Sequence, residues 1–217
     1  MQGPKTAGAR WLHDGIAIYY SHPSIQVSWC LDAEPHGATW VNRGNDHRLG
    51  TSHCVRKAWE YMLADAGLQY DFVAYDEVAR TGVPDAYRVL ILPACSALSN
   101  LEARRLREFC ERGGTLVADF LPGLFNRHGK GRARGALDEL FGMERTEPPA
   151  KSGVFGGELW VETDQEAGYE ATSYRRLFET VACELRDGYA VAERGRPGME
   201  RRVGRGRAIL LNLSPQR

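Results

Sequence analysis

The feature that most restricts the fold of this chain is a series of short apolar runs that alternate with segments of helical periodicity. The strongest run, Tyr87–Pro93, is nearly continuous, which is typical of a central parallel strand covered on both faces. Further runs at Ile16–Tyr20, Tyr70–Ala74 and Thr115–Asp119 predict three more strands. Because the joints between strands and helices are short, we expect parallel pairing with right-handed crossovers.

Two helices are predicted between these strands. The first is capped by Ser52 and stops at Gly67. Its apolar face contains Val55, Ala58, Trp59, Met62, Leu63 and Ala66. The second opens with a capping box, Ser99–Glu102, and ends at Gly113-Gly114. Its apolar stripe contains Leu101, Leu106, Phe109 and Cys110. The stretch from His22 to Gly50 shows no clear period and is expected to be a long irregular loop.

The predicted organisation has three parts. Residues 1–14 form an N-terminal extension, and residues 15–146 form an α/β core. Residues 147–217 form a β-rich part that packs on the same domain and ends in antiparallel hairpins around Gly204-Arg205-Gly206. The expected fold class is therefore α/β, an open doubly wound and mostly parallel sheet of flavodoxin-like type, with C-terminal antiparallel strands.

Charge and cysteine content exclude several classes of function. Lys+Arg and Asp+Glu both number 28, so the chain lacks the basic excess of a nucleic-acid binder. No window reaches 18 apolar residues, so no membrane span is expected. The five cysteines are odd in number and show no metal-ligand spacing, which predicts neither a disulfide framework nor a metal site. We therefore expect a cytoplasmic protein with no metal and no cofactor.

Ligands of open α/β sheets bind outside the carboxyl ends of the strands. The ligand-crevice candidates at those ends are Tyr20, Ser21, Tyr75, Asp76, Cys95, Ser96, Asp119 and Phe120. A carboxylate at Asp119 could bind a sugar hydroxyl or a partner's arginine, or it could accept hydrogen bonds from amides of its own loop. The structural role is the favoured interpretation of Asp119.

Cys95 is the one candidate nucleophile. It lies between a buried strand and a helix start, where a helix N-terminus would lower the thiol pKa. However, its context Pro93–Ala97 lacks the glycine that a nucleophile elbow requires. No histidine follows His128, so a downstream base is missing as well. We therefore predict no catalytic residue, and a cysteine-dependent hydrolase or amidotransferase using Cys95 is the alternative.

Two polar segments are candidate binding surfaces. The early loop contains aromatic and planar hydrogen-bonding side chains: Trp29, Trp40, Asn42, Arg43 and His47. This group is predicted to contact another domain or subunit, and a stand-alone carbohydrate-binding module is the alternative. The second segment carries Arg127, His128, Lys130, Arg132 and Arg134. It is interpreted as a solvated loop, because few aromatic residues for base stacking are interleaved.

Three segments together carry a resemblance to a known family. They read YRVLILPACSALS (87–99), LREFCERGGTLVADFLPGLFNRHGKGRARGALDELFG (106–142) and VGRGRAILLNLS (203–214). In this order they resemble the middle, trimerisation domain of family 42 glycoside hydrolases of the β-galactosidase type. The resemblance implies a fold like that of class I glutamine amidotransferases.

In that family the acid and nucleophile glutamates lie on a separate (β/α)₈ barrel. The resemblance therefore implies a domain that does not cleave glycosides by itself. Such a domain serves assembly and frames the active site of its parent enzyme in carbohydrate metabolism. The implied partners are the catalytic barrel and identical subunits, with neutral sugars as a further class of ligand.

Overall fold

A computed structural model describes residues 13–33, 51–119, 122–145, 183–185 and 199–211. The main element is a six-stranded sheet in the order β2-β1-β3-β4-β8-β7. Its strands are β1 (Ile16–Tyr20), β2 (Tyr70–Ala74), β3 (Val89–Leu92), β4 (Thr115–Ala118), β7 (Met199–Val203) and β8 (Gly206–Leu210). All neighbours pair in parallel except β7, which is antiparallel to β8 at one edge. A second, two-stranded antiparallel sheet pairs β5 (Met143–Arg145) with β6 (Cys183–Leu185).

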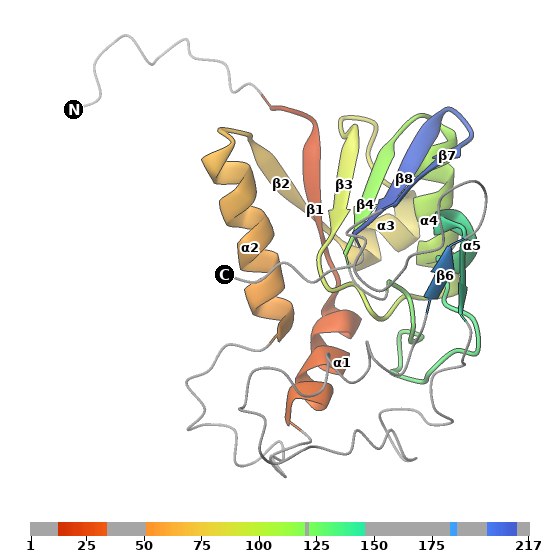
Figure 1. The fold of residues 1–217 in the computed structure, drawn as a ribbon. Coiled ribbons are helices and arrows are strands. Elements are labelled where there is room, and N and C mark those ends of the chain that lie inside the picture. Colours follow the sequence, from red (N-terminus) through yellow and green to blue (C-terminus); the bar gives the residue numbers. More distant parts are fainter. Residues whose placement is uncertain (1–12, 34–50, 120–121, 146–182, 186–198, 212–217) are drawn as a thin grey trace, which may run out of the picture.

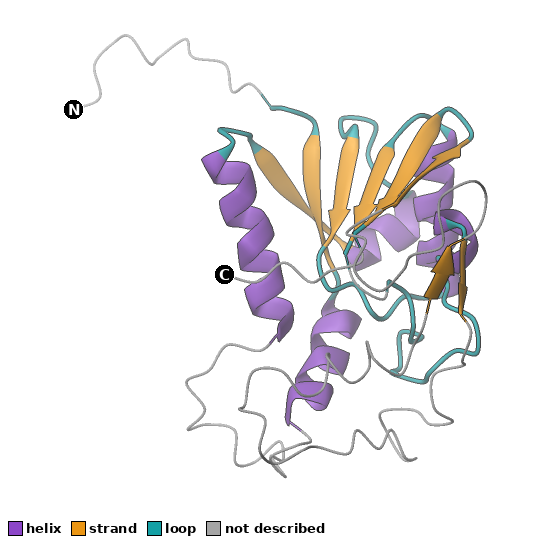
Figure 2. Ribbon diagram, in the orientation of Figure 1, coloured by secondary structure: helices purple, strands orange, loops and turns teal. Residues whose placement is uncertain are grey.

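The described residues form five helices around the sheet (Figures 1 and 2). They are α1 (His22–Ala33), α2 (Thr51–Asp65), α3 (Tyr75–Thr81), α4 (Asn100–Glu111) and α5 (Asp138–Phe141). Helix α2 lies in front of the sheet as drawn, whereas α3 and α4 lie behind it (Figure 1). Helix α5 packs its Leu140 and Phe141 into the same core as α4. Helix α1 extends from the carboxyl end of β1, below the strands. The predicted fold class, an open doubly wound and mostly parallel α/β sheet, is confirmed.

The two faces of the sheet bury different sets of side chains. Successive residues of a strand point to opposite faces, so register decides which residues share a core. Leu90 and Leu116 pair in register and, with Leu106 of α4, belong to the larger core on the side of α3–α5. Ile18 and Ile91 pair on the other face and pack with Leu63 of α2. The near-continuous apolar runs of the central strands follow from this burial on both sides.

Helix α4 confirms the predicted capping box. The hydroxyl of Ser99 accepts a hydrogen bond from the Glu102 backbone N–H, and the Glu102 carboxylate accepts one from the Ser99 backbone N–H. The predicted stripe was wrong at Leu101, which is 39% exposed, whereas Glu102 is buried. The capping bond turns the Glu102 side chain back toward the interior, and Leu101 then lies on the outer side of the first turn.

The predicted loop from His22 to Gly50 was wrong over His22–Ala33, where α1 lies. Ser21 supplies the N-terminal cap, because its hydroxyl accepts a hydrogen bond from the Ser24 backbone N–H at 3.2 Å. The helix has no clear apolar periodicity in the sequence, because serines occupy some of its inward-facing positions. Ser24 and Ser28 are both buried. Residues 34–50 lie outside the described part of the chain.

Helix α2 confirms most of the predicted apolar face but begins at Thr51, two residues before the start that a cap at Ser52 implies. Ser52 is therefore inside the helix, and its backbone N–H donates to the Ser28 hydroxyl of α1 at 3.1 Å. Met62 and Ala66, two members of the predicted face, are exposed. Gly67 ends the helix with a φ of 69°, as predicted.

The C-terminal hairpin of β7 and β8 confirms the predicted antiparallel strands around Gly204-Arg205-Gly206. Strand β8 also pairs in parallel with β4, so the hairpin completes the main sheet. Gly206 approaches the carbonyl oxygens of Gly114 and Cys110 so closely that a Cβ atom has no room there. Among the described helices, none is long and apolar enough to cross a membrane.

Candidate functional site

The carboxyl ends of β1 and β3 flank the point where the strand order reverses, which is where doubly wound folds hold ligands. In this chain serine side chains join the two ends. The Ser24 hydroxyl accepts a hydrogen bond from the Ala97 backbone N–H and donates to the Ala97 carbonyl, both at 3.0 Å. The Ser21 hydroxyl lies 2.8 Å from that of Ser24. Ser21, Ser24 and Ala97 are buried, so this part of the predicted crevice is closed by the chain itself.

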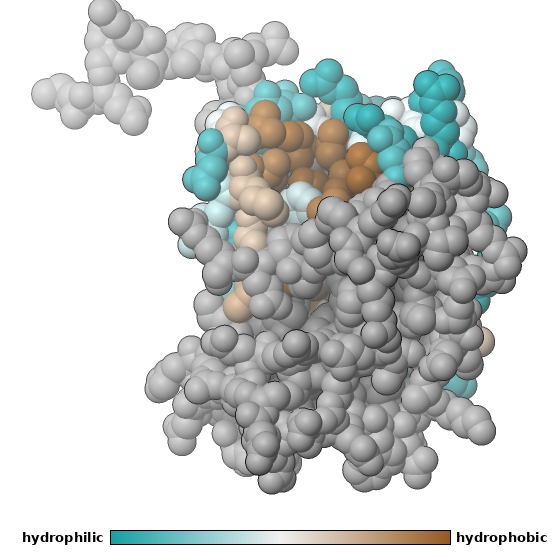
Figure 3. Space-filling model, in the orientation of Figure 1, coloured by the Kyte–Doolittle hydropathy of each residue, from teal (hydrophilic) through white to brown (hydrophobic). Residues whose placement is uncertain are grey.

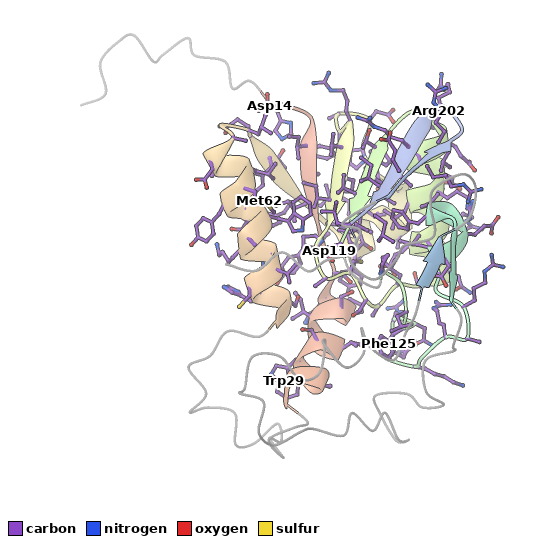
Figure 4. All side chains as sticks on the ribbon, viewed as in Figure 1. Asp14, Trp29, Met62, Asp119, Phe125 and Arg202 are labelled. Atoms are coloured by element: carbon purple, nitrogen blue, oxygen red, sulfur yellow. The ribbon has the colours of Figure 1, made fainter. Side chains whose placement is uncertain are left out.

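Asp119 performs the structural role that the sequence favoured. It follows β4 and is 1% exposed, at the carboxyl ends of the central strands (Figure 4). Both carboxylate oxygens accept the backbone N–H of Ala94, at 2.8 and 2.9 Å. The indole N–H of Trp59, from α2, donates to Oδ2 at 3.1 Å. Asp119 thus ties the end of β3 to β4 and to the helix in front of the sheet.

The residue that Asp119 holds is strained. Ala94 has a φ of +43°, the only positive value among the described residues other than glycine. Such a conformation costs an alanine about 1–2 kcal/mol and persists only where neighbouring groups enforce it. The strain brings the chain sharply away from β3, and Ser96 N–H then donates to the Ala94 carbonyl at 2.9 Å. This turn places Cys95 and Ser96 inside the protein.

Cys95 is placed unfavourably for nucleophilic chemistry. Its side chain is 1% exposed, and its Sγ lies 3.9 Å from the Ser24 hydroxyl. Burial, followed by the nearby Glu102 carboxylate, raises the pKa of the Cys95 thiol far above its ordinary range. A reactive cysteine requires the opposite shift and an accessible sulfur. Within the described residues, no histidine contributes to the electrostatic surroundings of this thiol.

Ser96 is fully buried, and its hydroxyl has no hydrogen-bond partner among the described residues. Its backbone groups are fixed on both sides: its N–H bonds to Ala94, and its carbonyl accepts the Phe125 N–H at 2.8 Å. Phe125 lies below the strand ends and is itself fully buried (Figure 4). Ser96 therefore lies within packed structure and not in an open crevice.

A buried polar pair lies behind the sheet. The Tyr19 hydroxyl of β1 donates to the Glu102 carboxylate of α4 at 2.5 Å, and both residues are almost fully buried. Burial is the main reason that the pKa of the Tyr19 phenol lies far above its ordinary value, so this group stays protonated. The charge of Glu102 is compensated by this bond and by the N-terminus of its own helix.

Tyr75 and Asp76 are the two crevice candidates that line a cavity. They follow β2, and the short helix α3 that begins at Tyr75 is an element that the strand pattern did not predict. The cavity has a volume of about 290 Å³. Its walls are Tyr75, Asp76, Ala79, Arg80, Leu101, Glu102 and Arg127. The lining thus combines acidic and basic side chains with the apolar Ala79 and Leu101.

Tyr20, the remaining candidate of β1, lies in an aromatic group at the other side of the sheet. Its ring packs edge-on against Phe72 of β2, with centroids 6.4 Å apart. The Arg56 guanidinium lies over the same ring at 5.4 Å. Tyr20 and Phe72 are 40% and 48% exposed. This group is separate from the serine network and from the cavity.

The basic loop is ordered by its own hydrogen bonds. The Asn126 side chain accepts the backbone N–H groups of His128 and Lys130. Arg132 donates to the Asn100 side chain and to the Leu98 carbonyl, both at 2.8 Å. The other cationic residues of the segment, Arg127, His128, Lys130 and Arg134, are exposed. Arg132 is thus a structural member of the loop.

The interface candidates of the early segment fall in two groups. Trp29 is a partly exposed residue of α1, at the lower end of the fold (Figure 4), and not part of a loop. Trp40, Asn42, Arg43 and His47 lie outside the described residues, as does Phe120. The described residues contain no cluster of three or more histidine, cysteine or acidic side chains that could hold a metal ion.

Sequence reasoning missed the residues that close the strand ends. Ser24 gave no signal, because its partner at Ala97 lies 73 positions further along the chain. Trp59 was predicted as a core residue, but its indole N–H is what reaches Asp119. The type of residue could have indicated this role, since the indole N–H of a buried tryptophan usually needs a hydrogen-bond acceptor.

These features define a class: a doubly wound α/β domain whose strand ends at the topological switch point are sealed by its own side chains. Residues 16–217 match the family described as the β-galactosidase trimerisation domain. The chain belongs to this family, as its sequence segments predicted. It is thus a domain of the kind that serves assembly in family 42 β-galactosidases.

Solved structures of larger enzymes contain the same fold. A β-galactosidase from the Antarctic haloarchaeon Halorubrum lacusprofundi aligns with 96% of this chain, at 18% identity and a TM-score of 0.58. A β-galactosidase from Bacillus circulans sp. alkalophilus aligns with 93% of it, at 17% identity and a TM-score of 0.53. An exo-β-1,4-mannosidase from Opitutaceae bacterium strain TAV5 aligns with 94%, at 16% identity and a TM-score of 0.53. The chain spans 29%, 29% and 32% of the length of these enzymes, respectively.

Proposed function

We propose that this chain joins identical copies of a glycoside hydrolase of the β-galactosidase type and helps to frame the active site of a catalytic barrel. The observation that carries the proposal is the family match over residues 16–217. The sealed strand ends support it, because the place where related folds bind small molecules is occupied by Ser24 and Asp119.

By this proposal the chain has no hydrolase activity of its own. Cys95 supports this, because its thiol is buried and has a raised pKa, and its described neighbours include no histidine. Two assays test the proposal. Sedimentation equilibrium is expected to show concentration-dependent self-association of the chain. A chromogenic galactoside is expected to stay intact in its presence. A strictly monomeric chain, or galactose release by the chain alone, would contradict the proposal.

Neutral sugars are a proposed further ligand, and the cavity between α3 and α4 is the place that suits them. Tyr75 offers an aromatic surface there, and Asp76, Arg80 and Arg127 offer hydrogen-bonding groups around it. The volume of about 290 Å³ is at the lower end for small-molecule sites. Titration calorimetry with galactose and short galacto-oligosaccharides tests this ligand, and no heat at millimolar sugar would exclude it.

A further inference from the structure

The cavity between α3 and α4 is lined by segments that follow three strands of the main sheet. Tyr75 directly follows β2, and Leu101 lies in the first turn of α4, the helix after β3. Arg127 lies in the loop that follows β4. Doubly wound folds bind ligands outside the carboxyl ends of their strands. The cavity therefore occupies the ligand-binding edge of the sheet, and all of its lining residues belong to the described part of the chain.

Both acidic residues of the lining already bond to backbone N–H groups at helix N-termini. One oxygen of the Asp76 carboxylate accepts the Glu77 N–H at 2.9 Å. The Glu102 carboxylate accepts the Ser99 N–H at 2.9 Å and the Tyr19 hydroxyl. Negative charge in the first turn of a helix is stabilised by the orphan N–H groups there. Both carboxylates are therefore stabilised without a cation from the cavity.

The two basic residues of the lining, Arg80 and Arg127, have no such partner. Neither guanidinium forms an ion pair or a hydrogen bond with any described residue. The arginines of the neighbouring α4 segment differ, because Arg105, Arg107 and Arg112 each pair with an acidic side chain. A guanidinium binds a carboxylate or a phosphate through two parallel hydrogen bonds. The cavity therefore has two cationic groups available for an anion.

The backbone around Arg127 is held in place by hydrogen bonds within the protein. On one side, the Phe125 N–H donates to the Ser96 carbonyl at 2.8 Å. The Asn126 N–H donates to the Lys130 carbonyl at 2.9 Å and closes the turn that contains Arg127. Ordering a loop on binding reduces affinity. Because this loop is already ordered, a ligand that pairs with Arg127 avoids most of that cost.

The surroundings of the cavity are basic. Lys130 and Arg134 are exposed residues of the loop that carries Arg127. Neighbouring cations attract anions through their summed field. The front of the sheet differs, because apolar side chains gather there between α2 and the β7–β8 hairpin (Figure 3). An anionic ligand is therefore expected on the side of α3 and α4, behind the sheet (Figure 1).

The remaining lining residues suit the body of a small ligand. Leu101 is 39% exposed, and Tyr75 and Ala79 are partly exposed. A ligand that covers this apolar surface removes it from water, which favours binding. The volume of about 290 Å³ is at the lower end for small-molecule sites, so it limits the ligand to about one sugar unit.

We infer that this cavity binds a monosaccharide that carries one anionic group, a carboxylate or a phosphate, and that Arg80 and Arg127 bind this group. The inference rests on the sugar ligand proposed above for the cavity, and it adds the charge that the two arginines select. The sugar ring packs against Tyr75 and Leu101, and the anionic group pairs with the two guanidinium groups.

Titration calorimetry of the full chain with galactose, galacturonate, galactose 6-phosphate and inorganic phosphate tests the inference. The preferred acidic sugar is expected to bind at least about tenfold more tightly than galactose, which corresponds to about 1.4 kcal/mol. The comparison of the two acidic sugars identifies the anionic group. Inorganic phosphate is expected to bind at least about tenfold more weakly than the preferred acidic sugar, because it lacks the sugar ring.

Substitutions in the lining test the assigned residues. Arg80→Gln and Arg127→Gln are each expected to weaken binding of the acidic sugar at least about tenfold. Arg134→Gln is the matched control, because it removes an exposed cation of the same loop that does not line the cavity. Leu101→Glu adds a carboxylate to the lining and is expected to weaken binding by competing for the two arginines. Circular dichroism of each variant verifies that it is folded.

The possible failures are distinguishable. Equal affinities for galactose and both acidic sugars would overturn the anionic site and leave the neutral sugar ligand standing. Unchanged binding in Arg80→Gln and Arg127→Gln, or an equal loss in Arg134→Gln, would overturn the assigned arginines. Inorganic phosphate that binds as tightly as the acidic sugars would overturn the sugar body of the ligand. No heat with any of these compounds at millimolar concentration would overturn both this inference and the proposed sugar ligand, whereas sedimentation tests the assembly function separately.

Discussion

Replacement of Asp119 by asparagine tests whether the strand ends depend on one buried carboxylate. The two oxygens accept hydrogen bonds from Ala94 N–H and from the Trp59 indole N–H. An asparagine keeps one acceptor oxygen, which at the Oδ2 position can still accept from both N–H groups. Its NH₂ group then takes the place of Oδ1, where it faces the Ala94 N–H and has no acceptor. Leaving a buried donor unsatisfied costs about 1–3 kcal/mol.

For a chain of 217 residues, a loss of about 2 kcal/mol lowers the melting temperature by roughly 4–8 °C. Urea denaturation followed by far-UV circular dichroism measures the free energy of unfolding, and an unchanged m-value shows that the unfolded state is unaffected. Asp85→Asn is the matched control, because that side chain is 96% exposed, and the expected change is within about 0.5 kcal/mol.

A second variant separates the two hydrogen bonds. Trp59→Phe removes the indole N–H that donates to Oδ2 and leaves both contacts from Ala94. Because the two side chains share this hydrogen bond, the loss of stability in the double variant is expected to differ from the sum of the two single losses by at least about 0.5 kcal/mol. If the two losses add, or if Asp119→Asn costs less than about 0.5 kcal/mol, the assignment of Asp119 as the tie between β3, β4 and α2 is wrong.

Three further predictions concern neighbouring parts of the fold. Ala94→Gly removes the Cβ atom that makes a φ of +43° unfavourable. The variant is expected to be more stable by between zero and about 1 kcal/mol. A clear loss of stability would contradict the claim that Ala94 is strained. Gly206→Ala forces a Cβ against backbone carbonyls of Gly114 and Cys110 and is expected to cost at least about 1–3 kcal/mol by thermal denaturation; a neutral result would refute the close approach. Burial raises the pKa of the Cys110 thiol from 9.0 to about 12. The contribution of the protonated thiol to the free energy of unfolding is therefore fully present below pH 9 and is lost as the pH rises toward 12. Cys110→Ala should flatten that alkaline decline in stability, and an unchanged slope would contradict the assignment.

The strands could be predicted because burial on both faces leaves a local trace in the sequence. Leu90, Ile91 and Leu92 are each at most 3% exposed, and only a run of apolar side chains suits such positions. The capping box of α4 was predictable for a similar reason, since Ser99 and Glu102 bond to each other within one turn.

The closure of the strand ends could not be predicted, because its partners are distant in sequence. Ser24 and Ala97 are 73 positions apart, and Ala94 and Asp119 are 25 positions apart. Helix α1 was missed for the same reason: its buried serines look polar locally, and their hydrogen bonds come from other elements. For Asp119 the sequence favoured a structural role, which its hydrogen bonds to Ala94 and Trp59 show, but nothing in the sequence named those two partners.

The central claim is that this domain joins identical copies, and its most direct test is the mass of the native particle. One chain weighs 24.2 kDa, so a trimer weighs three times 24.2 kDa, about 72.6 kDa. Native mass spectrometry of the purified chain, at concentrations across the micromolar range, is predicted to show a species of about 72.6 kDa that grows with concentration. A spectrum that contains only the 24.2 kDa species at every concentration would contradict the account.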